Sequence, residues 1–176
     1  MGSVSKQAFP AGTTAAVITV SDRCSAGTFH DLSGPEIAGL LVDHGVANVD
    51  RGLVVDDVEA IQAALREFAP RVRLIVTTGG TGLAPRDVTP EATTQICDRL
   101  VPGLSEVMRA EGLKQTPLAA LSRGVCGTLG TTLILNLPGS PAGARSSLLA
   151  VMHLLPHALD VLAGTPAHAE PPAHLQ

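Results

Sequence analysis

The chain has 176 residues, 45% of them apolar and 16% charged, which is typical of a globular protein and excludes a disordered one. A net charge of −4 and an aromatic content of only 2% argue against a nucleic-acid binder, which needs a basic surface or aromatic platforms for bases. Three dispersed cysteines, no signal-like first segment and no unbroken apolar run predict a cytoplasmic protein without a membrane span.

The first predicted elements are an arm, a buried strand and a helix. Residues 1–12 are small and polar, and we expect a flexible arm there. The run TAAVITVS at Thr14–Ser21 is apolar on both faces, as in a strand that is covered on both sides. After the polar segment Asp22–Ser33, apolar residues at helical spacing predict a helix over Pro35–His44, which Gly45 ends.

The middle of the chain repeats this alternation. Val49–Val55 is a second strand candidate, and Asp57 is placed to cap a helix over Val58–Phe68. Val72–Thr78 is the clearest strand of the chain, and it runs directly into a glycine loop at Gly79–Gly82. Strands that alternate with helices indicate a mostly parallel sheet covered on both faces.

The second half is predicted to be more helical. A helix starts at Pro90 with Thr89 as its cap, and helical stretches follow at Leu104–Glu111 and Leu118–Ser122. A last strand spans Thr132–Leu137. The turn Pro138–Pro141 then leads into a helix that begins near Ala142 and is kinked or broken at Pro156, and residues 165–176 are predicted to be a disordered tail, which leaves one domain over residues 13–164.

Four polar loops follow the predicted strands. In parallel sheets, ligands bind beyond the carboxyl ends of the strands, so these loops are expected to meet at one edge and to carry the chemistry. The loops are Asp22–Ser33, Asp56–Asp57, Gly79–Thr89 and Asn136–Ser140.

The glycine loop lies in the segment TTGGTGLAPRDVTP at Thr77–Pro90. Closely spaced glycines let backbone N–H groups gather around an anion, and the following helix N-terminus favours phosphate. Alternatively, the glycine loop is an ordinary strand-to-helix connection without a ligand. Asp87 beside such a pocket predicts Mg²⁺ between carboxylate and phosphate, with Asp56 as the second carboxylate, although Asp87 could instead cap the helix. Asp22 is a third candidate, with a plain surface-loop role as its alternative.

Four segments carry a resemblance to a known family. The segment TTGGTG…RDVTPEAT at Thr77–Thr94 resembles the signature of the molybdopterin adenylyltransferases of the MogA/MoaB type. The runs SDRCSAG from Ser21, TPLAALSR at Thr116–Arg123 and LILNLPGSP at Leu133–Pro141 are similar to further motifs of that family. Together they cover the chain from about Thr14 to Gly164.

The resemblance implies a three-layer α/β/α fold of the molybdopterin-binding-domain type, usually assembled as a homotrimer. It further implies transfer of AMP from Mg-ATP to molybdopterin, and a partner protein that uses the product for molybdate insertion. Asp56 and Asp87 take the positions of the family's two essential aspartates, and we assign both to Mg²⁺. With Asp22 added, the expected substrate-binding residues are Asp22, Thr78, Gly79, Gly80, Thr81, Gly82, Ser122, Asn136, Pro138, Gly139 and Ser140.

Two other functions stay open at this point. The first is a molybdopterin carrier or scaffold with weak catalysis. It rests on Val55, where many members have proline, and on Leu129, where several have arginine. The second is a different phosphosugar or nucleotide enzyme on the same fold, because a fold alone does not fix chemistry.

Overall fold

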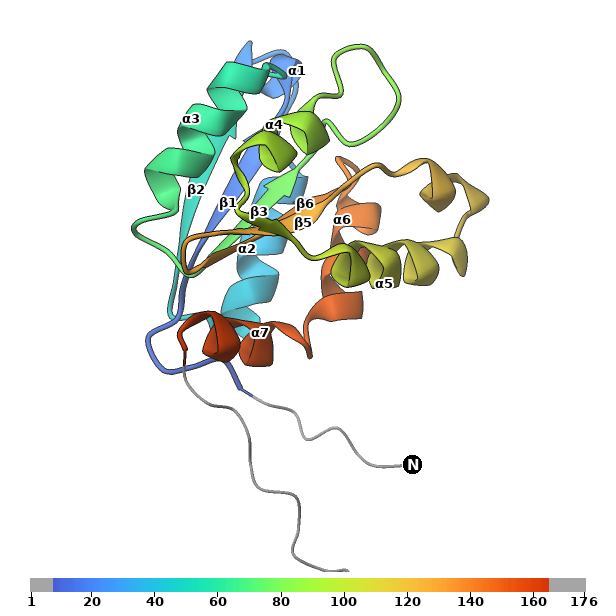
Figure 1. Cartoon of the computed structure of the whole chain (residues 1–176). Coiled ribbons are helices and arrows are strands. Elements are labelled where there is room, and N and C mark those ends of the chain that lie inside the picture. Colours follow the sequence, from blue (N-terminus) through green and yellow to red (C-terminus); the bar gives the residue numbers. More distant parts are fainter. Residues whose placement is uncertain (1–7, 165–176) are drawn as a thin grey trace, which may run out of the picture.

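The computed structural model describes residues 8–164, which form an α/β fold around one six-stranded sheet (Figure 1). The strands are β1 (Thr14–Val20), β2 (Asn48–Val54), β3 (Leu74–Thr78), β4 (Arg99–Leu100), β5 (Cys126–Leu129) and β6 (Thr132–Leu137). Their order across the sheet is β2-β1-β3-β6-β5-β4. The pairs among β2, β1, β3 and β6 are parallel, whereas β5 runs antiparallel to both β6 and β4. The predicted mostly parallel sheet is confirmed.

Helices cover both faces of this sheet. They are α1 (Asp22–Ser25), α2 (Ser33–Asp43), α3 (Val58–Phe68), α4 (Thr89–Ile96), α5 (Pro102–Leu113), the 3-10 helix η1 (Pro117–Leu121), α6 (Pro141–Val151) and α7 (Leu155–Leu162). Helices α3 and α4 pack on one face, and α2, α5, α6 and α7 contribute to the core on the other. The three-layer arrangement is therefore confirmed.

The two cores are separated by the alternation of side chains along each strand. In β1, Ala15 and Val17 pack with α2 and α6, whereas Ala16 and Ile18 pack under α3. Because both faces are covered, the central strands are apolar at nearly every position, which is why the sequence runs show no polar alternation.

A change in the direction of winding places a crevice between β1 and β3. The connection from β1 to β2 passes through α2 on one face, and the connection from β2 to β3 passes through α3 on the opposite face. In such sheets the ligand crevice opens at the carboxyl ends of the two strands that flank the reversal. The loops after β1, β2, β3 and β6 consequently lie at one edge, as expected from the sequence.

Two of the predicted helix starts fared differently. Asp57 caps α3, with its Oδ1 accepting the Ala60 amide at 3.0 Å, as predicted. Thr89 is not the cap of α4: Val88 holds that position, and the Thr89 hydroxyl instead donates to the Gly79 carbonyl at 2.9 Å. The C-terminal helix is broken, as predicted, but between Val151 and Leu155, so that Pro156 lies in the first turn of α7.

The ends and edges of the domain differ from the sequence prediction. Phe9 lies within the expected arm but is 8% exposed and packs into the core, because its ring is one of few large apolar groups available there. The short strands β4 and β5 and the one-turn helix α1 were not predicted. Residues 165–176, the expected tail, lie outside the described residues. Over residues 8–164, the helices are too short or too polar to cross a membrane.

Candidate functional site

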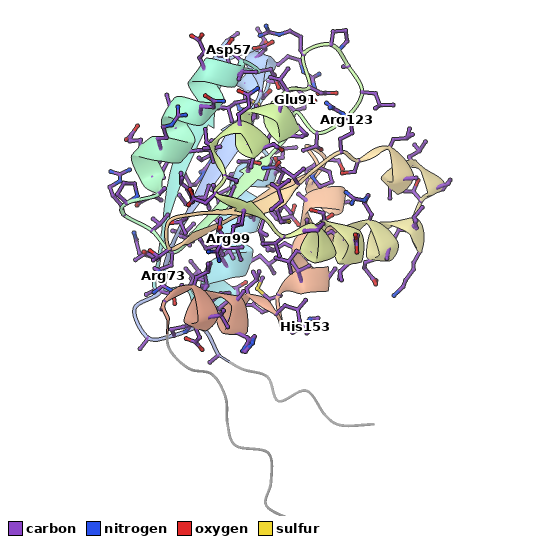
Figure 2. The ribbon with its side chains drawn as sticks, in the orientation of Figure 1. Asp57, Arg73, Glu91, Arg99, Arg123 and His153 are labelled. Carbon is purple, nitrogen blue, oxygen red and sulfur yellow. The ribbon has the colours of Figure 1, made fainter. Side chains whose placement is uncertain are left out.

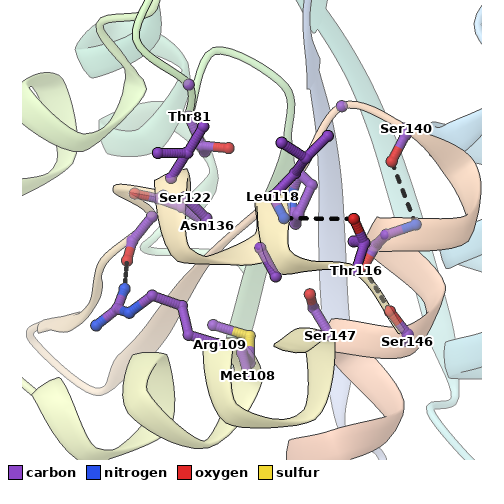
Figure 3. Close-up of a pocket in the computed structure, with 18 of the residues that line it drawn as sticks. Thr81, Met108, Arg109, Thr116, Leu118, Ser122, Asn136, Ser140, Ser146 and Ser147 are labelled. Carbon is purple, nitrogen blue, oxygen red and sulfur yellow. Dashed lines mark hydrogen bonds between the residues drawn. The ribbon is translucent and has the colours of Figure 1, made fainter. Parts of the chain in front are cut away.

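Two cavities open at the carboxyl edge of the sheet. The first, of about 560 Å³, lies between the glycine loop, α5, η1 and α6 (Figure 3). The second, of about 580 Å³, lies over the ends of β1 and β3 beside α1. The two share one wall, made of Gly80, Asp87, Gly139 and Ser140. Every predicted site residue lines one cavity or both.

Gly79 sets the shape of the glycine loop where β3 ends. Its φ of +102° is accessible to glycine, and a Cβ at this position would overlap the carbonyl oxygen of Val20 at the end of β1. Its amide donates to the Leu137 carbonyl at 3.1 Å. The Gly79 amide is thus occupied within the protein, so Gly79 shapes the loop and lines the cavity beside α1 without a free amide for an anion.

The next three residues of the loop leave their amides available. The N–H groups of Gly80, Thr81 and Gly82 donate to no acceptor within residues 8–164. All three residues line the cavity between α5 and α6, and Gly80 also lines the cavity beside α1. Backbone amides gathered at the wall of a hollow are suited to binding an anion.

The three predicted aspartates lie in the cavity beside α1. Asp22 and Asp56 bond reciprocally: each carboxylate accepts the other residue's amide, at 3.0 and 2.7 Å. Arg86 donates two hydrogen bonds to Asp22, at 2.8 and 2.9 Å. Asp87 accepts the Ala84 amide at 2.8 Å, so its carboxylate does not cap α4. The carboxylates of Asp22, Asp56 and Asp87 are therefore brought together, but that of Asp22 is already engaged.

The charges in this cavity are unbalanced toward the acidic side. Burial raises the pKa of Asp56, and the negative charges of Asp22 and Asp87 act in the same direction. The hydrogen bond from Arg86 lowers the pKa of Asp22. Neither Asp56 nor Asp87 forms a salt bridge with any described basic side chain. The site favours a cation between these two carboxylates.

This imbalance predicts a gain in stability when Asp56 is neutralised. Because its pKa is raised in the folded state, ionisation of Asp56 opposes folding, and this penalty is fully present above the raised pKa. Asp56→Asn should therefore melt roughly 1–3 °C above the wild type at pH 7.5, given about 2–4 °C per kcal/mol for a domain of this size. The gain should shrink as the pH falls toward the ordinary aspartate value, where the wild-type carboxyl is protonated too.

Calorimetric melting at pH 7.5 and pH 5 measures this difference. Asp57→Asn is the matched control. Asparagine caps a helix as well as aspartate does, so this substitution should leave the melting temperature unchanged. An Asp56→Asn protein that melts below the wild type at pH 7.5 contradicts the electrostatic argument.

The other predicted residues differ in how free their side chains are. Asn136 is 1% exposed, and its Nδ2 donates to the hydroxyls of Thr77 and Thr93, both at 3.0 Å. Its oxygen accepts the Val125 amide at 3.3 Å, so Asn136 braces the cavity floor and retains acceptor capacity on that oxygen. The Thr78 hydroxyl bonds to Ser33 at 3.1 Å.

The turn after β6 supplies the remaining predicted positions. Ser140 caps α6, with its hydroxyl accepting the Gly143 amide at 3.3 Å (Figure 3). Gly139 lies against Gly79, so this turn closes over the glycine loop. Pro138 and Ser122 line the cavity between α5 and α6.

The carboxylates of Asp56 and Asp87 in the cavity beside α1 fit a magnesium ion that is shared with a substrate. Mg²⁺ is usually held by one or two carboxylates, with phosphate and water completing its shell. Among the described residues, no group of three or more His, Cys, Asp or Glu side chains is arranged to hold a metal ion. Asp56 and Asp87 therefore fit a metal that arrives with a phosphate-bearing substrate, and they do not form a closed metal site.

Several wall residues were missed by the sequence prediction. Met108, Leu118, Ser146 and Ser147 line the cavity between α5, η1 and α6. Their helices were predicted, but a single sequence does not say which neighbouring helix faces which. Thr89 was noticed as a helix cap, whereas it braces the glycine loop from behind.

The fold and the cavities together define an α/β protein whose strand ends carry two adjoining cavities with free backbone amides suited to an anion. The family model described as "Probable molybdopterin binding domain" matches residues 16–157. A protein of Helicobacter pylori named molybdopterin adenylyltransferase is 40% identical over 152 residues, which are 84% of this chain and 86% of that protein. The solved structure of the molybdopterin biosynthesis enzyme MoaB from Thermus thermophilus is 51% identical, with a TM-score of 0.79 over 89% of this chain and 99% of that one.

The chain therefore belongs to the molybdopterin adenylyltransferase family of molybdenum cofactor biosynthesis, and it is an enzyme of that family. The Drosophila melanogaster protein named molybdenum cofactor synthesis protein cinnamon is 46% identical over 153 residues. This chain spans about a quarter of that protein's length, and 85% of the chain takes part in the match.

Proposed function

We propose that this protein transfers AMP from ATP to molybdopterin, giving adenylylated molybdopterin and pyrophosphate. The observation that carries the proposal is the wall shared by the two cavities, which contains the free amide of Gly80 and the carboxylate of Asp87. The free amides of Thr81 and Gly82 line one of the adjoining cavities, and the carboxylate of Asp56 lines the other. Two substrates bound in adjoining cavities bring their phosphates to that wall. Bringing reactants together in this way supplies much of the catalysis in phosphoryl-type transfers.

The chemistry of each cavity suggests its occupant. The cavity between α5, η1 and α6 is lined largely by hydroxyls and aliphatic side chains, including Met108 and Leu118, with Arg109 also in its wall, and suits the ring system of the pterin. The cavity beside α1 contains Asp22, Asp31 and Asp56, and its acidity suits a triphosphate only in the company of a metal ion. The amides of Gly80, Thr81 and Gly82 would hold the pterin's terminal phosphate.

In the proposed reaction, the terminal phosphate oxygen of molybdopterin forms a bond to the α-phosphorus of ATP while the bond to the β-phosphate oxygen breaks. Gly80–Gly82 fix the attacking phosphate by their amides. Asp56 and Asp87 would hold Mg²⁺, which would supply positive charge to the triphosphate and to the leaving pyrophosphate. Ser122 and the oxygen of Asn136 orient pterin groups by hydrogen bonds.

The direct test is a pyrophosphate-release assay with purified protein, molybdopterin and Mg-ATP. We expect one pyrophosphate for each adenylylated molybdopterin, and no release when molybdopterin is left out. Binding of molybdopterin without any transfer would favour the carrier or scaffold function instead. Binding of a nucleotide or phosphosugar in place of the pterin would favour a different enzyme on this fold.

The two sequence departures lie outside the proposed machinery. Neither Val55 nor Leu129 lines either cavity, and Leu129 packs against the core beneath α3 and α4. Two hydrogen bonds with Asp22 fix the position of Asp56, so the backbone conformation at Asp56 does not depend on a proline at position 55. These positions give the carrier function little support.

Assembly and partners follow from the family resemblance. The proposed homotrimer is tested by light scattering on the purified protein. The proposed consumer of the product is a molybdate-insertion protein; a Synechococcus elongatus relative of about twice this length is named molybdenum cofactor biosynthesis bifunctional protein. A cytoplasmic location and the absence of nucleic-acid binding stay predictions from composition.

A further inference from the structure

The carbonyl groups of the glycine loop are all held from one side, beginning with Thr89. Its hydroxyl donates to the Gly79 carbonyl at 2.9 Å, and its amide donates to the Gly80 carbonyl at 3.1 Å. Thr89 is fully buried and lines neither cavity. It therefore lies behind the loop, on the side away from the proposed phosphate.

Arg123 continues this row of donors. Its amide donates to the Thr81 carbonyl at 2.9 Å, and its Nε donates to the Gly82 carbonyl at 2.7 Å. Its Nη2 donates to the Asp87 carbonyl at 2.5 Å, and its Nη1 pairs with Glu91 at the start of α4, as Figure 2 shows for the two side chains. One guanidinium thus spans both ends of the loop that carries Asp87.

Fixing a carbonyl also fixes the amide that follows it. In a trans peptide the N–H points opposite to the C=O, and the described residues contain no cis peptide. The held carbonyls of Gly79, Gly80 and Thr81 therefore turn the N–H groups of Gly80, Thr81 and Gly82 to the opposite side. These are the three amides without an acceptor in the described part of the chain.

The guanidinium of Arg123 does not face the proposed ligand. Arg123 lines neither cavity, and three of its N–H groups are taken by the Gly82 and Asp87 carbonyls and by Glu91. Partial burial of Glu91 acts against ionisation, but the hydrogen bond and charge of Arg123 lower the pKa of Glu91, so the pair is ionised at neutral pH. A phosphate in the pocket would face backbone dipoles and not this guanidinium.

We propose that Arg123 and Thr89 are positioning residues for the Gly80, Thr81 and Gly82 amides. The Thr89 hydroxyl and the backbone amides of Thr89 and Arg123 hold the carbonyls that precede these N–H groups, and the Arg123 guanidinium anchors the far end of the loop through the Gly82 and Asp87 carbonyls. The proposal rests on the phosphate pocket of the proposed function. It assigns the contribution of the Arg123 side chain to its hydrogen bonds to the Gly82 and Asp87 carbonyls, which fix the end of the loop, and not to its positive charge.

The test is an NMR titration of the ¹⁵N-labelled protein with inorganic phosphate, followed at the Gly80, Thr81 and Gly82 amides. Lysine keeps the charge of Arg123 but cannot donate to two carbonyls and Glu91 at once. Arg123→Lys and Arg123→Gln should therefore weaken phosphate binding alike, by about tenfold, as expected for loss of one or two aligned hydrogen bonds. Thr89→Val should weaken it similarly, and Thr89→Ser should restore it.

Arg71→Gln is the matched control, because Arg71 pairs with Glu67 on the surface and touches neither the loop nor a cavity. Phosphate binding close to wild type in Arg123→Lys, with loss only in Arg123→Gln, overturns the proposal in favour of simple charge. Wild-type affinity in both variants, or no phosphate shift at these amides in the wild type, also overturns it. Thr89→Val and Thr89→Ser keep the test decisive if the arginine variants fold poorly.

Steady-state kinetics separate this proposal from the proposed reaction. In the variants, we expect a raised KM for molybdopterin and a smaller change in kcat, because the loop binds the acceptor phosphate. Absence of transfer in the wild type would overturn the adenylylation proposal, while the phosphate titration would still decide the role of Arg123.

Discussion

Replacing Asp87 by asparagine should reduce AMP transfer by about 100-fold or more while leaving molybdopterin binding within a few-fold of the wild type. The expected loss corresponds to several kcal/mol of charge stabilisation supplied by a metal-held leaving group, at about 1.4 kcal/mol per tenfold. Asparagine can still accept the Ala84 amide, so the shape of the loop is preserved and only the charge is removed. The measurements are single-turnover transfer and equilibrium binding of molybdopterin.

Asp57→Asn serves as the control again, because Asp57 lies beside Asp56 but caps α3 and lines neither cavity. It should keep full transfer activity. Unchanged transfer in Asp87→Asn would remove Asp87 from the mechanism. Loss of molybdopterin binding together with transfer would place Asp87 in the pterin site and not at the leaving group.

Replacing Gly79 by alanine should abolish transfer and destabilise the protein by about 3 kcal/mol or more. Two costs combine at this position: a positive φ, which disfavours a side chain by roughly 1–2 kcal/mol, and overlap of the new Cβ with the Val20 carbonyl. Relief of the overlap must separate the ends of β1 and β3, over which the cavity beside α1 lies and where the glycine loop begins. Urea denaturation gives the stability, and the pyrophosphate assay gives the activity.

Gly45→Ala separates the conformational cost from the cost of the overlap. Gly45 has a φ of +96°, but a Cβ there would meet no atom within 4 Å. It should lose only the conformational part, about 1–2 kcal/mol, and keep full transfer activity. Equal destabilisation by the two substitutions would show that the Val20 carbonyl moves away at little cost and that strain at Gly79 is not what shapes the loop.

The central part of the fold could be predicted because each buried strand is a short apolar run between turn signals. Val72–Thr78 and Thr132–Leu137 stand out in this way, and their strands begin and end within two residues of the prediction. The strands β4 and β5 could not be found, since β4 has two exposed residues and β5 contains a glycine. They are strands because β5 pairs with the free side of β6 and β4 then pairs with β5, which is a tertiary effect.

The site was predicted in part for a similar reason. Residues that follow a strand end, such as Asp56 and Gly80, could be placed together from topology alone. The direction of each donor could not be read from the sequence. The hydrogen bonds of Asn136 to Thr77 and Thr93, and of Arg123 to the Gly82 carbonyl, depend on side chains and carbonyls that meet only in the folded chain.

The common wall of the two cavities has a consequence for turnover. A product that joins pterin and AMP would keep the contacts of both substrates. It would lose translational and rotational entropy only once on binding, whereas two separate substrates each lose it, so the product should dissociate more slowly than either substrate. Release would then limit the rate at which the protein works. An acceptor that docks over the mouth of the cavities and withdraws the adduct directly would accelerate the cycle without altering the bond-making step.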